Sequence, residues 1–471
     1  MFLLQSNIAQ SFQSPYVRVL LAAIALGLLY ILWREVRKIP PRLFTLMTTA
    51  FIDMLGLLMI IPLLPFYVQS LGESGINIFG LHFGVGTIVG FIVAAYTFAQ
   101  LISAPMWGRF SDRVGRRPTL LIALGASAIA YLIFGFANSL LLLFLSRLVQ
   151  GAGGGTVGVI QAYVADTTDP KDRARALGWL SATTNLGVAL GPVLGSFALT
   201  IGKYDVLPGA PTLRLGAAAP GIFAAALCLI NMAFAARYLT ESRNPEDHDA
   251  SQPRRTSRQA AWGVISHSGE PASRLIWIYA IAIGAFQGSF AVLALFLNAR
   301  FQVTAQTIGY FFMYIGSISV FTRVLLLGRM VDWLGEAKLS RLGLILLAAG
   351  VFGMPLARNL PMLALTVALI PLGTAFTFPC VTALLSRVIS PRERGLYMGM
   401  QQTYGGIARI IAPLFFGWAF DSIGVSAPYF FSAAFIFATI LLGFGLDKYA
   451  RPPVAASSKG AAGVPAESTE T

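Results

Sequence analysis

Hydrophobic runs long enough to cross a bilayer follow one another along almost the whole chain. A helix of about twenty residues rises about 30 Å, the thickness of the hydrocarbon core. Twelve such runs form two sets of six on either side of a polar stretch, Thr240 to Ser273. The first set is Leu43–Val68, Gly84–Trp107, Pro118–Phe136, Leu140–Ala165, Ala176–Ile201 and Gly216–Leu239. The second set is Arg274–Asn298, Ala305–Leu327, Leu339–Ala357, Leu360–Leu385, Leu396–Phe420 and Pro428–Leu446.

A further apolar run, Tyr16 to Trp33, precedes both sets. Its 18 residues rise about 27 Å, and no cleavage site follows it. An interfacial helix is the alternative, but the run lacks the charged face that such a helix needs. The pattern predicts an all-α integral membrane protein with two six-helix bundles and one extra N-terminal membrane helix.

This reading divides the chain into five segments. They are an N-terminal segment 1–42 with the extra helix at 16–33, a bundle 43–239, a cytoplasmic linker 240–273, a second bundle 274–447 and a disordered cytoplasmic tail 448–471. The linker is polar and rich in Arg, Asp, Ser and Pro, which indicates a mobile connection. The tail consists of small, polar and proline residues, which cannot bury enough apolar surface to fold. A patch from Trp262 to Ile265 within the linker is expected at the membrane surface.

The two sets of six are related in sequence. The segment Asp169 to Gly178 opens one span, and the similar segment Ser390 to Gly399 opens another 221 residues later. Pro192 and Pro413 keep the same offset. Parallel repeats of this kind imply two bundles that enclose a site near the bilayer midplane and rock around it.

Composition and charge support the membrane assignment. The chain is 56% hydrophobic and only 11% charged, with a mean hydropathy of +0.71. Its net charge of +14 is concentrated in alternate loops: 26 Lys and Arg residues lie on one side and five on the other. This bias places the rich side in the cytoplasm. We therefore expect a multi-pass protein of the cell inner membrane with a cytoplasmic C-terminus, and no nucleic-acid partner.

The segment Gly108 to Arg117 is the most distinctive polar stretch between two spans. It holds four arginines and one aspartate within ten residues. We expect a tight loop pinned to the membrane surface, with an ordinary basic cytoplasmic loop as the alternative. Gly328, Asp332 and Gly335 repeat the spacing of its glycines and aspartate, which indicates a duplicated element.

Asp53 is the only one of the 20 acidic residues that lies well inside an apolar span, about 15 Å deep. A carboxyl group there must pair or stay protonated. It is therefore a candidate proton carrier, or else a structural acid neutralised by an arginine or a backbone donor. Arg147 is the expected partner, and Gln150 shares its helix face.

Glycines and arginines inside other spans are further candidates. Close helix approach is expected along Gly151, Gly154, Gly155 and Gly158 and along Gly187, Gly191 and Gly195, the latter strip with a bend at Pro192. Arg323 and Arg409 also lie within spans. Arg409, in mid-helix, can hold a bundle closed, bind an anionic substrate group or satisfy carbonyls near Pro413.

Polar and aromatic residues in the spans are candidates for the wall of a substrate cavity, since such groups line pockets for organic ligands. They are Tyr96, Gln100, Tyr131, Asn185, Phe286, Gln287, Phe290, Gln401, Gln402, Tyr404 and Arg409.

Several of these motifs resemble the major facilitator superfamily, and most closely its drug:proton antiporters of the tetracycline-resistance exporter group. The segment from Gly108 to Arg117 matches the superfamily signature. The run Arg147 to Gly153 is similar to the proton-transfer motif, and Gly187 to Gly195 to the antiporter motif. The resemblance also rests on Asp53–Gly56 with Pro62 and Pro65, on Ala95, Tyr96 and Gln100, and on Ala162–Asp166.

The resemblance implies the export of a small, mainly apolar organic compound in exchange for protons, by a monomer in the lipid bilayer. Asp53 would carry the proton, with Arg147 and Gln150 tuning it. The implied seal between bundles is Gly187, Gly191, Pro192 and Gly195. The implied conformational latch of the outward-open state is Gly108, Asp112, Arg113, Gly115, Arg116, Arg117 and Asp166, the last as ion partner of Arg113 or Arg116.

The chain departs from the tetracycline exporters in three runs. Ile122–Phe136, Ile308–Leu327 and Leu342–Leu356 hold no Asp, Glu or His, where those exporters carry acids and a histidine. Ala130 and Ser319 stand near the expected places. Tetracycline is therefore a poor candidate substrate. The alternatives are a uniporter or importer of a small, anionic metabolite, and a non-transporting receptor or scaffold.

The sequence gives no support for an enzyme. Its three histidines, His82, His248 and His267, lie in predicted loops or the linker, and its two cysteines, Cys228 and Cys380, lie in apolar spans. No phosphate-binding loop or paired carboxylates accompany them. We expect no cofactor and no metal site.

Overall fold

The fold is described from a computed structural model of the chain. The described residues are 40–72, 75–78, 81–154, 156–169, 172–202, 216–242, 257–390 and 393–449. The predicted N-terminal helix at 16–33 and most of the predicted tail lie outside them, so both stay predictions.

In its described residues the N-terminal bundle contains seven long helices or half-helices, two short helices and a small hairpin. In chain order they are α3 (Pro41–Ile60), α4 (Leu64–Leu71), β1 (Ile76–Ile78), β2 (Leu81–Phe83), α5 (Val85–Val114), α6 (Arg116–Gly135), α7 (Leu140–Gly153), α8 (Thr156–Thr167), α9 (Arg173–Ile201), η1 (Gly216–Ala218) and α10 (Ala219–Tyr238). The strands pair antiparallel, with Asn77 opposite His82. The sequence analysis did not predict this hairpin.

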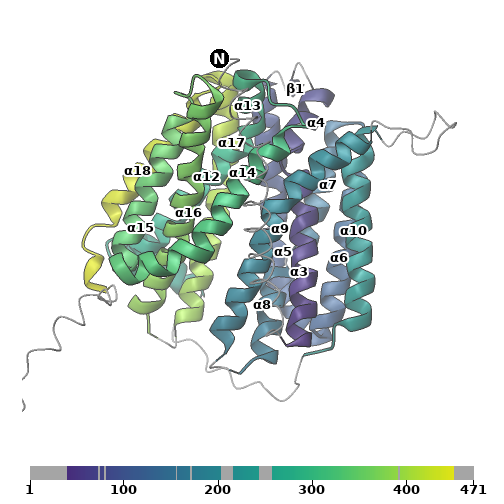
Figure 1. The fold of residues 1–471 in the computed structure, drawn as a ribbon. Helices are drawn as coiled ribbons and strands as arrows, with labels where there is room; N and C mark the ends of the chain where they lie inside the picture. Colours follow the sequence, from purple (N-terminus) through teal and green to yellow (C-terminus); the bar gives the residue numbers. More distant parts are fainter. Residues whose placement is uncertain are drawn as a thin grey trace, which may run out of the picture.

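The rest of the described chain forms a linker helix and the second bundle. The elements are α11 (Ser257–Ser266), α12 (Pro271–Ala291), α13 (Leu293–Phe301), α14 (Ile308–Phe321), η2 (Thr322–Leu326), α15 (Leu327–Gly353), α16 (Leu360–Val388), α17 (Arg394–Ser422), α18 (Ala427–Leu442) and η3 (Asp447–Tyr449). Figure 1 shows the two bundles side by side, the first in purple to teal and the second in green to yellow.

The described residues cross the membrane twelve times. Nine stretches are long and apolar enough to span it, and one of these, Ile308–Gly353, is 46 residues long. Because residues rise about 1.5 Å each and the backbone breaks at Gly335, that stretch crosses twice. α17, with 29 residues, and the shorter apolar helix α18 complete the count. The all-α membrane fold with two six-helix bundles is therefore confirmed.

The two ends of the molecule are named here from their connections. The hairpin end carries β1, β2 and the start of α5, and Figure 1 places α4 and α13 at the same end. The linker end carries the break between α5 and α6 and the segment between α10 and α12.

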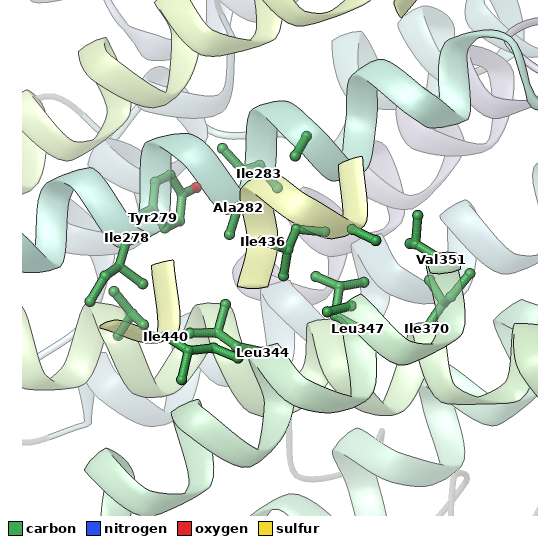
Figure 2. Packing of buried hydrophobic residues seen from close by; sticks show 14 of the residues in the cluster. Ile278, Tyr279, Ala282, Ile283, Leu344, Leu347, Val351, Ile370, Ile436 and Ile440 are labelled. Atoms are coloured by element: carbon green, nitrogen blue, oxygen red, sulfur yellow. The ribbon is translucent and has the colours of Figure 1, made fainter. Parts of the chain in front are cut away.

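Each bundle has its own apolar core. In the second bundle, Figure 2 shows Ile278 and Ile283 of α12 in one cluster with Leu347 of α15 and Ile436 of α18. All four are less than 9% exposed. Burial of one such side chain contributes about 1.5–3 kcal/mol where the alternative is water. Between helices already in lipid, close packing is the larger contribution.

Several spans are broken where proline or glycine makes the helix weak. The first predicted span is two helices, α3 and α4, with a turn at Ile61–Leu63 that contains Pro62. The fourth is divided into α7 and α8 in the glycine run that begins at Gly153. Proline lacks the amide that a helix needs, and glycine has the greatest backbone freedom.

The linker is not wholly irregular, because it contains helix α11. Ala260 and Val264 are fully buried in the core of the second bundle, while Trp262 is 68% exposed on the other face. The Tyr404 hydroxyl donates to the carbonyl of Ala261 at 2.9 Å. Helix α11 is thus docked across α12 and α17.

Candidate functional site

The two bundles meet along two helix pairs, α5 with α17 and α9 with α14. A Cβ atom on Gly90 would lie 2.3 Å from the carbonyl oxygen of Pro413, so the backbones of α5 and α17 are in direct contact. The Ser196 hydroxyl donates to the carbonyl of Ala305 and accepts from the amide of Gly309, both at 3.0 Å. These contacts bring the bundles together at the hairpin end.

Asp53 lies near the middle of the first span, inside the N-terminal bundle. It lines a small cavity between α3, α6 and α8, with the hydroxyls of Thr49 and Ser127 in the same lining. Among the described residues Asp53 is in none of the ion pairs that the structure contains. A carboxyl group in such a place is stable when neutral and costly when charged.

Arg147 is the buried counterpart of this acid. Its side chain is 2% exposed, and its guanidinium lies 5.0 Å from the centre of the Phe134 ring. The Nε–H donates to Ser146 at 3.3 Å, but neither terminal nitrogen has a hydrogen-bond partner within the described chain. Leaving buried donors of a charged group unpaired is unfavourable.

Tyr131 of α6 lies near both Asp53 and Arg147. Its ring packs on Gly56 of α3, where a Cβ would lie 3.3 Å from Cε2, and its hydroxyl is within range of electrostatic interaction with both side chains. Gln150, at 3% exposure, leaves its side-chain oxygen unpaired among the described residues. Asp53 and Arg147 therefore do not form the predicted direct ion pair among the described residues, although both lie near Tyr131.

A second polar cluster lies where α5 faces α17. The Gln100 amide donates to the carbonyl of Gly154 at 3.0 Å and to the Tyr96 hydroxyl at 3.3 Å. Tyr96 is also within electrostatic reach of Arg409 on the opposite bundle. Arg409 donates to the carbonyl of Gly405 at 3.1 Å and to the side-chain oxygen of Gln402 at 3.4 Å. These predicted cavity residues do come together.

Three other predicted cavity residues are inside bundles instead. Tyr131 is 1% exposed and Gln401 is 0% exposed, with Gln401 accepting from Thr382 at 3.2 Å. Tyr404 packs against Trp277 and binds the linker helix. The position of each residue around its helix decides whether it faces the bundle interior or the interface, because adjacent residues such as Gln401 and Gln402 point about 100° apart.

The remaining predicted cavity residues are partly or fully exposed. Phe286 and Phe290 are ring neighbours 4.5 Å apart on α12, and Gln287 between them is exposed. Asn185 donates to the carbonyl of Ser181 one turn earlier, at 2.6 Å.

The segment Gly108–Arg117 is not a loop, contrary to the sequence prediction. Helix α5 continues to Val114, and α6 begins at Arg116. Only Gly115 interrupts the helices, with φ of +112°, a conformation that suits glycine. Water at the membrane surface can solvate these polar side chains while they remain on a helix. The helical hydrogen bonds of the backbone therefore continue through the segment on both sides of Gly115.

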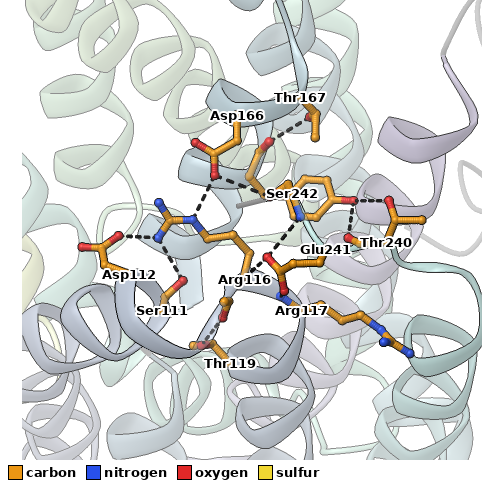
Figure 3. A network of polar contacts seen from close by, with 12 residues as sticks. Ser111, Asp112, Arg116, Arg117, Thr119, Asp166, Thr167, Thr240, Glu241 and Ser242 are labelled. Atoms are coloured by element: carbon orange, nitrogen blue, oxygen red, sulfur yellow. Dashed lines mark hydrogen bonds and ion pairs between the residues drawn. The ribbon is translucent and has the colours of Figure 1, made fainter. Parts of the chain in front are cut away.

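Arg116 is the centre of the polar network at the linker end (Figure 3). Its Nη1 lies 2.6 Å from Asp112 and 3.0 Å from the Ser111 hydroxyl, and its Nε lies 3.0 Å from Asp166. The Arg116 side chain is only 14% exposed. Of the two predicted partners of Asp166, the structure thus gives Arg116. Both ion pairs of Arg116 lie within the N-terminal bundle, and Ser242 of the following connection also contacts Asp166.

Glu241 was missed by the sequence analysis. Its carboxylate accepts the backbone amides of Arg116 at 2.8 Å and Arg117 at 3.1 Å, which caps the first turn of α6 (Figure 3). A carboxylate is favourable at a helix N-terminus, where amides are unpaired. The residue lies about 125 positions away along the chain, so no local pattern reveals it.

The glycines of the antiporter motif do not seal the two bundles, so that expectation is wrong for them. A Cβ on Gly187 would lie 2.8 Å from the carbonyl oxygen of Phe51, and one on Gly195 would lie 2.1 Å from that of Met59. Both contacts, like that of Gly191, are with α3 of the same bundle. Small residues there allow α9 and α3 to approach closely.

Pro192 lies on the other side of α9, where its carbonyl is 3.1 Å from the Cβ position of Gly309 on α14. Of the four predicted motif residues, it is therefore the one that meets the second bundle. The contact between bundles on this pair of helices includes Pro192, Ala189 and Ser196.

The duplicated glycine spacing has a structural counterpart in the second bundle. Gly335 interrupts α15 with φ of +72° and ψ of 160°, close to the conformation of Gly115. The next residue, Glu336, is 5% exposed and pairs with Arg387 at 2.5 Å. The repeats thus place an ion pair at equivalent positions, with acid and base exchanged.

Within the described ranges, no group of three or more His, Cys, Asp or Glu side chains is arranged to hold a metal ion. Cys228 and Cys380 are both free and buried.

Comparison with known proteins agrees with the twelve-helix arrangement. The model of the Major Facilitator Superfamily matches residues 46–369 and 324–469. Multidrug resistance protein 1 of Bacillus subtilis (strain 168) is 29% identical over 403 residues, covering 85% of this chain and 93% of the relative. Tetracycline resistance protein, class B, of Escherichia coli is 26% identical and covers 78% of this chain and 85% of its own.

The fold also matches solved transporter structures. The crystal structure of the human organic anion transporter MFSD10 superposes with a TM-score of 0.63 at 22% identity, covering 86% of this chain and 99% of that one. Proteins of this family transport small molecules across lipid bilayers and are not enzymes. From the family match and the two six-helix bundles together, the chain belongs to the Major Facilitator Superfamily.

Proposed function

We propose that the protein exports a small, mainly apolar organic compound in exchange for protons, as a monomer. The linker end faces the cytoplasm, the C-terminus lies on the same side, and the membrane is the cell inner membrane. The bundles rock about their contacts so that the midplane site opens to one side at a time.

The observation that carries this proposal is the placement of Asp53. It is an acid in mid-membrane that lines a cavity with two hydroxyl residues and takes part in no described ion pair. A group in that setting can bind and release a proton as its surroundings change between the two conformations. A purely structural acid would be expected to have a fixed partner.

Arg147 is the second part of the proton site. Its terminal nitrogens are unpaired in the described conformation, and Tyr131 lies near both it and Asp53. When Asp53 loses its proton, a small shift of α7 toward α3 would give the carboxylate and the guanidinium a common partner. In the protonated state Arg147 returns to Phe134. The pair would thereby couple proton release to helix movement.

The linker-end network supplies the proposed conformational latch. In the present arrangement Asp112 is bound to Arg116 of its own bundle and remains 58% exposed. Such an exposed pair is weak, about 0–1 kcal/mol. Asp112 can therefore leave Arg116 for a partner on the second bundle when the outward-open state forms.

The test is transport by purified protein in liposomes under an imposed pH gradient, with the fluorescent cation ethidium as first probe. We expect uptake that stops when an ionophore collapses the gradient. Asp53→Asn should abolish gradient-driven movement but retain counterflow. Asp172→Asn, an exposed acid at the start of α9, is the matched control. Uptake that persists without the gradient would contradict proton coupling.

A second candidate is a uniporter or importer of a small organic anion. Arg409 favours it, because this cation near the bundle interface is bound only to uncharged oxygens among its described partners. The matched probe is the anion fluorescein. If Arg409→Gln removes fluorescein transport while Arg358→Gln, in an exposed position, does not, the anion candidate replaces the export of apolar compounds.

A further inference from the structure

A carboxylate from one bundle caps a helix of the other at the hairpin end. Asp421, in the last turn of α17, accepts the amide of Gly86 at 2.9 Å and the amide of Thr87 at 2.7 Å. It also accepts the Thr87 hydroxyl at 2.6 Å. All three donors belong to the first turn of α5.

The geometry satisfies a need of α5. The first amides of a helix have no partner within it, and the helix dipole favours a negative charge there. No side chain of α5 itself caps this terminus. The C-terminal turn of α17 meets the N-terminal turn of α5, so the two helix dipoles also attract each other.

The backbone around Asp421 leaves no space for larger residues. A Cβ on Gly84 would lie 2.4 Å from the Asp421 carboxyl carbon. A Cβ on Gly86 would lie 2.9 Å from both the Asp421 carboxylate and the Gly417 carbonyl. Glycine thus permits the carboxylate to reach the amides directly.

Glu241 uses the same chemistry at the opposite end, with one difference. It caps α6 from the connection that follows α10, within one bundle, so it can stay in place while the bundles move. Asp421 caps α5 across the bundle interface, and any movement that parts the bundles at the hairpin end must break its three hydrogen bonds.

We propose that Asp421 is a latch that closes the hairpin end by capping α5 from the second bundle. The latch is a positioning device for alternating access and touches neither substrate nor proton site. It rests on the proposed rocking of the bundles, but not on the coupling ion or the identity of the substrate.

The test measures accessibility at the hairpin end without any substrate. Ala294 of α13 is 3% exposed and packs in a core cluster with residues of the N-terminal bundle, so Ala294→Cys reports parting of the bundles. The background carries Cys228→Ala and Cys380→Ala. The protein is reconstituted in liposomes with the hairpin end outside and the linker end inside. A membrane-impermeant maleimide added outside then reaches only the hairpin end.

We expect Asp421→Ala to raise the labelling rate roughly five- to thirtyfold, the factor that follows from losing a helix cap. Thr87→Val, which removes only the hydroxyl donor, should give a smaller rise. The control Asp447→Ala breaks the pair with Arg341 inside the second bundle and should change nothing. An unchanged rate in Asp421→Ala, or an equal rise in Asp447→Ala, overturns the latch.

A cross-link gives an independent measurement if the alanine variant does not fold. Oxidation of a Thr87→Cys, Asp421→Cys pair, whose native side chains are in contact, should trap the hairpin end closed, hold labelling of Ala294→Cys at its slow rate, and be reversed by a reductant. Labelling that stays fast after complete cross-linking would show that the hairpin end opens without breaking this contact, and would overturn the proposal. Failure of proton coupling would leave both results unchanged.

Discussion

The ion pair of Arg116 with Asp166 offers a quantitative test of the linker-end network. Two unit charges about 4 Å apart attract by about 4 kcal/mol at an effective dielectric constant of 20. Desolvation offsets much of this, because Arg116 is 14% exposed and Asp166 28% exposed. We expect a net coupling of about 1–2 kcal/mol. The contact of Arg116 with the 58% exposed Asp112 should be worth less than about 1 kcal/mol.

The assay is a double-mutant cycle with Arg116→Gln and Asp166→Asn, measured by reversible unfolding in mixed micelles. A second cycle with Asp112→Asn shares the same arginine variant and serves as the control. The more exposed acid, Asp112, makes the shorter contact, 2.6 Å against 3.0 Å for Asp166, so a larger coupling to Asp166 would report the environment and not the distance. A coupling to Asp166 no larger than that to Asp112 would refute the reasoning that burial strengthens this pair.

Three further changes test other contacts. Gly335→Ala should destabilise the second bundle by about 1–2 kcal/mol, because the positive φ of this residue disfavours a side chain. Gly328→Ala is the control, since a Cβ there meets open space, and thermal unfolding should show no change for it. Gly90→Ala should slow transport in the liposome assay several-fold, because the added methyl collides with the backbone of α17; normal rates would show that this close approach is dispensable. Tyr404→Phe should loosen α11 by about 1 kcal/mol, seen as faster proteolysis of the linker, and unchanged cleavage would contradict its role in docking.

The hydrophobic pattern determined the architecture because lipid leaves few choices. A backbone in hydrocarbon must satisfy its hydrogen bonds within the segment, so each apolar run of about twenty residues is a helix, and the duplicated motifs then give two bundles. The same reasoning located Asp53 in mid-membrane and Arg147 inside the fourth span. The spacing of Gly328 and Gly335 also anticipated the repeated backbone break, which the structure places at Gly335.

Tertiary structure decided which side chains meet. Partners such as Asp421 with Thr87 are more than 300 residues apart, and no periodicity links them. Gln401 and Gln402 are chemically alike in sequence, but the phase of α17 buries one and exposes the other. The antiporter glycines face α3 rather than the second bundle because small residues specify only that some backbone approaches closely. Which helix approaches these glycines depends on how all the helices of the fold pack together, and no local sequence pattern records that.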